Sequence, residues 1–234
     1  IEKISQDTIS LEQPIGDEYI PPELLHREQE KYPVDLFLCR SCGHVQLLDV
    51  INPAVLYKNY IYVTSSSLGL VEHFSNYARE VVETIKPKKE ELVIDIGSND
   101  GTLLQSFRGY GLRVLGIEPA EHIAKKATEN GTETLPNFFT SDVASSIRER
   151  YGKAKIITAN NVLSNIDDLG HVIDNVHDLL TPDGVFITEV FYLGDLIKNM
   201  VFDYIYHEHL DYHSIIPLKY FLENHKMQLL DVKE

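Results

Sequence analysis

The chain has 234 residues, 43% of them hydrophobic, and its 21 Lys and Arg against 36 Asp and Glu give a formal charge of −15. This length allows one large core, or one domain with a small appendage. A chain this acidic has no general attraction for nucleic acid or for an anionic membrane surface, so we expect neither as a partner. No apolar run approaches the roughly 18 residues of a membrane helix, and no signal peptide is visible. The spacing of the two cysteines suits a metal better than a disulfide, so we expect a cytoplasmic protein.

The first part of the chain has little periodicity. Residues 1–55 contain several prolines and both cysteines, and we expect a small irregular arm or appended module there. Residues 56–90 are expected to form a helical connector. Within it, apolar residues recur at helical spacing from Leu70 to Ile85 and predict a helix over 66–86, which Pro87 ends.

From residue 91 to residue 234 the pattern predicts one α/β domain. Strands alternating with helices indicate a mostly parallel sheet that is covered on both faces. Strands are predicted over 92–96, 112–117, 132–135, 154–159, 185–190 and 228–232. Helices are predicted over 100–109, 120–130, 141–151, 168–180 and 215–224, with a turn at 182–184.

The turn after the first of these strands is the clearest candidate ligand site. Gly97 and Gly101 stand between the end of the strand at Asp95 and the next helix, and glycine lets a ligand approach the backbone closely. Open α/β sheets bind ligands at this edge. The spacing is Gly-x3-Gly and not the Gly-x-Gly-x2-Gly of dinucleotide folds, which favours S-adenosylmethionine (SAM) over NAD. The sequence therefore predicts a Rossmann-like sheet of the class I methyltransferase type; the alternative is an α/β domain that binds another nucleotide or none.

Polar residues at the neighbouring strand ends support this interpretation. Glu118 follows Gly97 by 118 − 97 = 21 residues and can accept hydrogen bonds from both ribose hydroxyls. Phe138 and Phe139 follow the third strand, where either could stack on adenine or belong to the core. The predicted cofactor-binding residues are Asp95, Gly97, Ser98, Asn99, Asp100, Gly101, Glu118, Pro119, Phe138, Phe139, Asn160 and Asn161.

A dense group of titratable residues follows the fifth strand. The segment 202–214 (FDYIYHEHLDYHS) combines tyrosines, histidines and a glutamate. Histidine and tyrosine suit proton abstraction and hydrogen bonding to a developing oxyanion. Two other interpretations remain: surface histidines on an acidic loop, or a metal site formed by His207, His209 and His213 with Glu208.

The two cysteines form a Cys-x2-Cys-Gly pair, Cys39 and Cys42. Two thiolates at this spacing can bind one tetrahedral Zn²⁺, but a structural site needs four ligands. The pair alone is equally compatible with a zinc site and with two buried thiols.

Together these segments resemble the SAM-dependent sugar C-methyltransferases of deoxysugar biosynthesis. The resemblance rests on residues 32–50, 60–65, 94–104, 116–120 and 159–163 and on the segment 202–214. It implies an N-terminal zinc module, here a remnant holding the second of two cysteine pairs, and it implies that the first pair, the last sheet strand and a C-terminal domain lie outside this chain. It also implies C-methylation next to the ketone of a nucleotide-linked 4-keto-deoxyhexose.

The resemblance further implies roles for four residues. His209 would be the general base, Tyr206 and Glu208 would lie beside it, and Tyr62 would reach over the cofactor or substrate. One departure stands out, because Asn165 occupies a position where the family often has histidine. An O- or N-methyltransferase for another small molecule, and a catalytically inactive SAM-binding module, are the alternatives.

Overall fold

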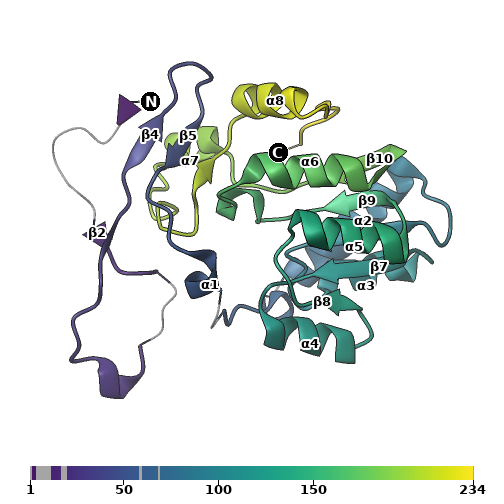
Figure 1. The fold of residues 1–234 in the computed structure, drawn as a ribbon, viewed down its shortest axis with the longest axis horizontal. Helices are drawn as coiled ribbons and strands as arrows, with labels where there is room; N and C mark the ends of the chain where they lie inside the picture. Colours follow the sequence, from purple (N-terminus) through teal and green to yellow (C-terminus); the bar gives the residue numbers. More distant parts are fainter. Residues whose placement is uncertain (1, 4–11, 17–19, 58–59, 68, 234) are drawn as a thin grey trace. The chain divides into compact units, whose positions relative to one another are not determined.

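The computed structural model describes residues 2–3, 12–16, 20–57, 60–67 and 69–233. The chain forms two compact units (Figure 1). We call residues 61–162 and 168–189 the sheet unit, and residues 1–60, 163–167 and 190–234 the hairpin unit. Within the described residues, no helix combines the length and the apolarity needed to cross a membrane.

The sheet unit is built on a parallel sheet of five strands in the order β10-β9-β6-β7-β8. Every residue of β6 and of β9 is buried. Because successive side chains of a strand point to opposite faces, both faces of the central sheet must be covered. The strands are β6 (Leu92–Ile96), β7 (Arg113–Ile117), β8 (Thr134–Leu135), β9 (Ala154–Thr158) and β10 (Leu180–Ile187). The predicted α/β fold is confirmed.

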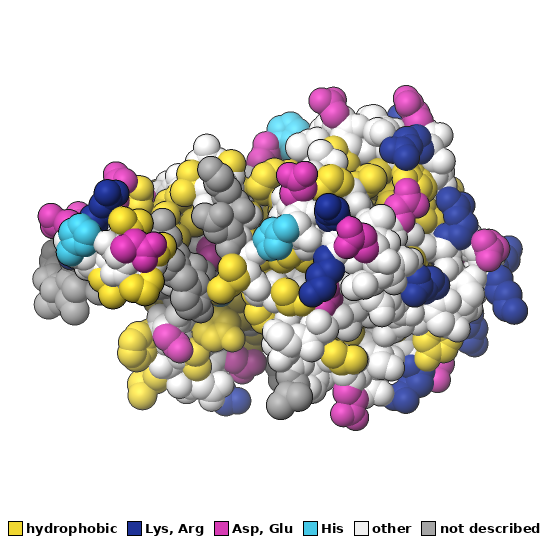
Figure 2. All heavy atoms as spheres, turned by 90° about the horizontal axis from the view of Figure 1, so that it is seen from below, with side chains coloured by type: hydrophobic (Ala, Val, Ile, Leu, Met, Phe, Trp, Pro, Cys, Tyr) yellow, Lys and Arg dark blue, Asp and Glu magenta, His cyan; other side chains and the backbone are white. Residues whose placement is uncertain are grey.

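Helices alternate with these strands, as predicted. Phe74 and Ala78 of the long first helix pack with Leu104 and Phe107 against Val93 of the central strand, which forms one core layer. The helices of this unit are α2 (Leu70–Ile85), α3 (Thr102–Gly109), α4 (Glu121–Glu129), α5 (Ser141–Tyr151) and α6 (Leu169–Leu179). Figure 2 shows basic and acidic side chains interspersed over the face that it draws of this unit.

The helix predicted over 66–86 is shorter than expected. Residues Thr64–Ser66 form a separate 3-10 turn, and Gly69 takes a left-handed φ of 92° before α2 begins. This break lets the residues before α2 hydrogen-bond elsewhere, as described for the site below.

Two predictions for the end of the chain differ from the structure. The residues of the turn predicted at 182–184 lie inside β10, where the register with β9 shifts between Leu180 and Val185. The strand predicted over 228–232 was wrong, because no strand is assigned there in the described chain. Leu230 and Val232 are 74% and 48% exposed, and a strand needs a hydrogen-bonded neighbour.

The hairpin unit joins segments that are far apart in the sequence. Its antiparallel sheet has the order β1-β4-β5-β11, so the residue pair Asp211–Tyr212 extends an N-terminal hairpin. The core below it contains Val45, Leu47 and Leu210. Its elements are β1 (Glu2–Lys3), β2 (Glu12–Gln13), β3 (Tyr32–Pro33), β4 (Leu36–Leu38), β5 (Val45–Leu47), α1 (Pro53–Leu56), α7 (Leu193–Asn199), β11 (Asp211–Tyr212) and α8 (Ile215–Asn224). The units are defined by contacts, and the domain boundaries at 55 and 90 stay sequence predictions.

Candidate functional site

The turn between β6 and α3 requires glycine at two places. Gly97 has a φ of 72°, and a Cβ there would lie 2.4 Å from Cγ2 of Val162. Gly101 has a φ of 79°, and a Cβ there would lie 2.8 Å from Cγ2 of Thr132. Any larger residue would be strained in its backbone and would displace these neighbours. The close packing explains the Gly-x3-Gly spacing of the sequence.

Asn99 ties the segment before α2 to this turn. Its Oδ1 accepts from the backbone N–H of Thr64 at 2.8 Å, and its Nδ2 donates to the carbonyl of Tyr62 at 2.9 Å. Asparagine tolerates the left-handed φ of 48° found here better than most residues. Tyr62, whose hydroxyl lies 3.0 Å from Oγ of Ser67, is thereby held beside the predicted cofactor turn.

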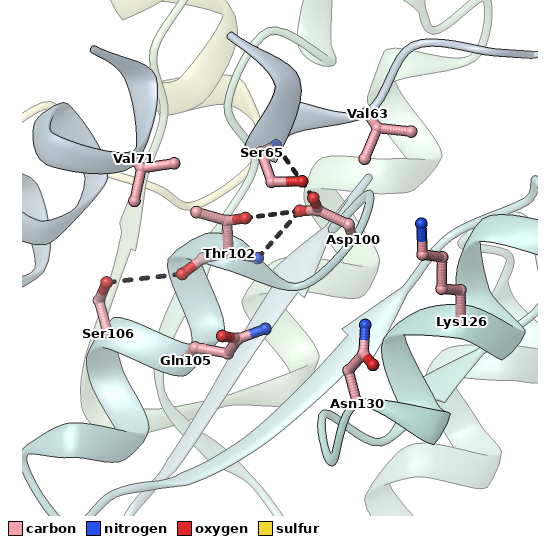
Figure 3. A pocket seen from close by; sticks show the side chains of 9 residues that line it. All are labelled: Val63, Ser65, Val71, Asp100, Thr102, Gln105, Ser106, Lys126 and Asn130. Carbon is pink, nitrogen blue, oxygen red and sulfur yellow. Dashed lines mark hydrogen bonds between the residues drawn. The ribbon is translucent and has the colours of Figure 1, made fainter. Parts of the chain in front are cut away.

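Asp100 makes a second tie to the same segment (Figure 3). Its Oδ2 accepts from the backbone N–H of Ser65 at 3.0 Å, and its Oδ1 accepts from both the backbone N–H and the hydroxyl of Thr102. Partial burial raises the pKa of Asp100, but these hydrogen bonds outweigh it and hold the pKa below its ordinary value. The carboxylate therefore holds the first residue of α3 and anchors the segment, and its predicted contact with cofactor stays a prediction.

A cavity of about 420 Å³ lies next to Asp100 in the sheet unit. Figure 3 shows Gln105 and Ser106 of α3 lining it on one side, with Lys126 and Asn130 coming from α4 and its C-terminal end. Its lining carries one acidic and one basic side chain, so neither sign of charge dominates.

Glu118 closes β7 directly beside the turn. Only 4% of it is exposed, its Oε2 accepts from the backbone N–H of Asn99 at 3.0 Å, and its Oε1 accepts from that of Ala120 at 2.8 Å. Burial raises the pKa of Glu118, and the two backbone donors oppose that shift. Pro119 follows it at the start of the loop to α4. The predicted acid thus lies next to the predicted turn.

Asp95 is the fourth residue of β6 and is 5% exposed. Burial raises its pKa to about 7, Thr158 Oγ1 donates to its Oδ1 at 2.7 Å and opposes the rise, and the charge of Glu118 adds to it. The carboxyl group is therefore partly protonated at neutral pH.

This burial predicts a pH-dependent stability that Asp95→Asn removes. Between its ordinary pKa of 3.8 and about 7, the folded chain keeps the proton that the unfolded chain has lost, so the free energy of unfolding falls as pH rises through this window. Above pH 7 the resulting loss in free energy of unfolding approaches about 4 kcal/mol, since each pKa unit corresponds to about 1.4 kcal/mol. Urea unfolding from pH 4.5 to 8.5 measures it. The stability advantage of the Asn variant should grow with pH, and parallel curves would contradict the assignment.

Two buried polar atoms at this edge of the sheet have no hydrogen-bond partner among the described residues. They are Oγ of Ser98 and Nδ2 of Asn160. Buried donors are normally paired, so the pair fits a site that a polar ligand completes. Asn161 lies beside them with a φ of 56° and donates its N–H to the carbonyl of Glu189. The predicted SAM site fits these residues.

The structure separates the two candidate adenine neighbours. Phe139 is 9% exposed and belongs to the core, whereas Phe138 is 42% exposed in the loop after β8.

We therefore expect different results from the alanine variants of Phe138 and Phe139. Phe139→Ala should lower the free energy of unfolding by about 3–5 kcal/mol. Phe138→Ala should leave stability unchanged and weaken SAM binding by about 1–3 kcal/mol, the usual range for stacking on a base. Urea unfolding measures the loss of stability, and calorimetry measures the affinity for SAM. If both variants bound SAM as tightly as the wild type, adenine stacking would be contradicted.

In the hairpin unit, His209 has a defined tautomer. Its Nδ1 lies 2.8 Å from the carbonyl oxygen of Tyr204, and a carbonyl only accepts. In the neutral ring the proton is therefore on Nδ1, and Nε2 carries the lone pair. The hydroxyl of Tyr206 lies 3.0 Å from that nitrogen and donates to it. Glu208 is 6% exposed, so a buried acid stands beside the Tyr206–His209 pair in the sequence.

The other histidines of the segment have different partners. His207 is buried, and its Nε2 lies 3.1 Å from the carbonyl of Tyr32. Burial lowers the pKa of His213 to about 4, so this ring is neutral at pH 7. Within the described ranges, no group of three or more His, Cys, Asp or Glu could hold a metal ion. The structure thus does not bring the histidines together as the metal alternative would require.

Asn165 contacts a partly buried tyrosine. Its Nδ2 donates to the hydroxyl of Tyr57 at 3.0 Å. Burial raises the pKa of Tyr57, the hydrogen bond from Asn165 opposes the shift, and the charge of Glu208 adds to it. The amide that replaces the expected histidine is therefore part of the same hairpin unit as the predicted base.

Cys39 and Cys42 lie in the turn between β4 and β5. Gly43, with a φ of 79°, donates its N–H to the carbonyl of Cys39 and closes the turn. Hydrogen bonding to the backbone N–H of Cys42 lowers the pKa of Cys39, which favours a thiolate. The two sulfurs could supply half of a tetrahedral site, but the described residues offer no further ligands near them. This set does not suffice for zinc, and no step below uses a metal.

Comparison with known proteins decides the family. Residues 70–228 match a family model described as "Methyltransferase domain". The chain belongs to the methyltransferase family. Residues 7–57 match a model described as "Putative zinc binding domain", as the resemblance implied. The chain is also 38% identical, over 201 residues, to C-methyltransferase NovU of Streptomyces niveus.

That match covers 86% of this chain and 48% of the relative, so the chain spans about half the length of the curated protein that it matches. Solved structures resemble the fold. A chain of the complex between the Haloferax volcanii Trm112 methyltransferase activator and a methyltransferase has a TM-score of 0.55 at 13% identity, covering 70% of this chain and 73% of that one. Magnesium protoporphyrin IX methyltransferase of Synechocystis PCC 6803 has a TM-score of 0.51 at 17% identity. The match covers 70% of this chain and 76% of that one.

Three residues around the site were not predicted from the sequence. Thr158 meets Asp95, while Tyr77 and Glu189 both donate hydrogen bonds to Asn160. In the sequence, Tyr77 falls among the apolar residues that predict the helix from Leu70 to Ile85. A tyrosine on the apolar face of a helix is a weak indication of a nearby polar group, because a buried hydroxyl needs a polar partner.

Proposed function

We propose that this chain carries the cofactor-binding and proton-abstracting residues of a SAM-dependent methyltransferase that methylates carbon. The substrate is a nucleotide-linked keto-deoxysugar, methylated α to its ketone. The observation that carries the proposal is the lone pair of His209 Nε2, which the contact of Nδ1 with the Tyr204 carbonyl defines. The similarity to a protein named as a C-methyltransferase supports carbon as the acceptor.

The sheet unit binds the cofactor in this proposal. SAM supplies an electrophilic methyl group on its sulfonium. The carboxylate of Glu118 would accept from the ribose hydroxyls, the backbone at Gly97 would allow close approach, and the exposed ring of Phe138 would stack on adenine. These contacts mainly position the methyl group, and positioning is a large part of such a rate enhancement.

The hairpin unit supplies the proton chemistry. His209 Nε2 takes the proton from the carbon α to the ketone, and the electrons of that C–H bond form the enolate. The Tyr206 hydroxyl has to leave Nε2 for this step, and it is then free to donate to the enolate oxygen. Bound SAM would supply its methyl group to the enolate carbon and would leave as S-adenosylhomocysteine.

Solvent exchange tests the reaction type. The chain is incubated in D₂O with a nucleotide-linked 4-keto-deoxyhexose and S-adenosylhomocysteine, which cannot donate a methyl group. We expect deuterium at the α-carbon and, with SAM, a methyl group on that carbon by NMR. A methyl group on oxygen or nitrogen without α-exchange would refute carbon methylation.

A further inference from the structure

Asn160, at the carboxyl end of β9, is held by two elements of the sheet unit. Its Oδ1 lies 2.9 Å from the backbone nitrogen of Glu189 and 3.4 Å from the hydroxyl of Tyr77. A backbone N–H can only donate, so the amide oxygen must face it. The orientation of this side chain is therefore determined by its partners, and the amide nitrogen must point the other way.

That nitrogen is the feature without a protein counterpart. Nδ2 of Asn160 is inaccessible to solvent, and no described residue accepts a hydrogen bond from it. A buried donor without an acceptor is unfavourable, so a ligand that supplies one binds with an advantage. The missing partner is an acceptor, preferably an anionic one, because charged acceptors make the stronger hydrogen bonds.

The strand order shows which part of SAM would supply this acceptor. Glu118 ends β7, Gly97 follows β6 and Asn160 follows β9, and these three strands are neighbours in that order. With the ribose at Glu118 and adenine at Phe138 beyond it, the amino-acid end extends over β6 toward β9. Its carboxylate is the anionic acceptor of the cofactor.

The supports of Asn160 come from α2 and from Glu189, which follows β10. His73 and Tyr77 lie one helical turn apart on α2, and Nε2 of His73 lies 2.7 Å from Oε1 of Glu189. Phe74 and Ala78 of the same helix pack in the core with Ile156 of β9. Burial raises the pKa of Tyr77, so its hydroxyl keeps its proton and remains a donor.

We infer that Asn160 Nδ2 binds the amino-acid carboxylate of SAM, with Tyr77 as the positioning residue that orients the amide. This inference rests on the proposed cofactor. It goes further by assigning one atom of the protein to one group of the ligand, and by giving α2 a role in recognising the cofactor.

Decarboxylated SAM tests the inference, because it lacks the carboxylate and keeps the ammonium, ribose and adenine. Calorimetry compares both ligands on the wild type, Asn160→Asp and Tyr77→Phe. Asn160→Asp keeps the Oδ1 acceptor and replaces the donor with an anionic oxygen. We expect it to weaken SAM by about 10-fold or more and decarboxylated SAM by less than about threefold. Tyr77→Phe should weaken SAM by about three- to tenfold and leave decarboxylated SAM nearly unchanged.

The matched control is Tyr110→Phe, which removes the hydroxyl of a 43% exposed tyrosine at the end of α3 and should change neither affinity. Thermal unfolding checks that each variant is folded. Equal weakening of both ligands would overturn the inference and leave the cofactor assignment intact, because a purely structural role affects both alike. Failure of the folded wild type to bind SAM would instead overturn the proposed function, and the inference with it.

Discussion

Replacing His209 with alanine is expected to lower the rate of methyl transfer by about 10²- to 10⁴-fold, the range that general acid–base catalysis contributes. The variant loses the Nε2 lone pair that the contact with the Tyr204 carbonyl defines. The binding constant for SAM should stay within about twofold, which is ~0.4 kcal/mol, because the predicted cofactor residues belong to the sheet unit.

Single-turnover transfer of labelled methyl to the keto sugar measures this loss, and α-deuterium exchange should fall with it. His26→Ala is the matched control, since His26 is an exposed histidine of the same unit. Tyr206→Phe keeps the ring and removes the hydroxyl that contacts Nε2, so its rate should lie between those of the wild type and His209→Ala. Unchanged turnover in His209→Ala would remove His209 from the mechanism.

Replacing Glu118 with glutamine is expected to weaken SAM binding by about 10- to 100-fold. Hydrogen bonds to a charged acceptor contribute about 1.5–3 kcal/mol each, and the amide has one acceptor atom where the carboxylate has two. In the free chain both carboxylate oxygens already accept backbone N–H groups, from Asn99 and Ala120. The variant therefore also loses one of these bonds, and its free energy of unfolding should fall by about 1–3 kcal/mol.

Calorimetry and urea unfolding separate the two consequences. Glu121→Gln serves as the control, because Glu121 is an exposed acid in the first turn of α4. The ligand series should include an analogue without the ribose hydroxyls, whose affinity the substitution would change much less. A loss of stability with unchanged SAM affinity would show that Glu118 acts only on the folded turn.

Much of the sheet unit could be predicted from the sequence. The bounds of β6 and α5 match the predicted ranges, and so do those of α8 in the hairpin unit. Buried parallel strands are continuous apolar runs, and helices have the 3.6-residue periodicity, so both leave a local record in the chain. The strand predicted over 228–232 also had the local pattern, but the pattern does not show whether a neighbouring strand is present to pair with it.

The candidate site could be predicted in part, for the same reason. The spacing of Gly97 and Gly101 predicts the turn. Both residues take a left-handed φ, and glycine is the residue type that adopts this conformation without strain. The sequence also placed Phe138 and Phe139 next to each other but could not distinguish them. Their exposures of 42% and 9% depend on what packs around the loop, which local patterns do not encode.

The sequence by itself determined the alternation of strands and helices, the cofactor turn and the tyrosine–histidine segment, because these follow from residue types and short spacings. Only the tertiary structure decided the contacts between distant residues. It paired Asn99 with Thr64, oriented Asn160 through Tyr77 and Glu189, and extended the N-terminal hairpin with residues 211–212. Hydrogen bonds of this kind join atoms that are close in space only after folding, so no spacing along the chain predicts them.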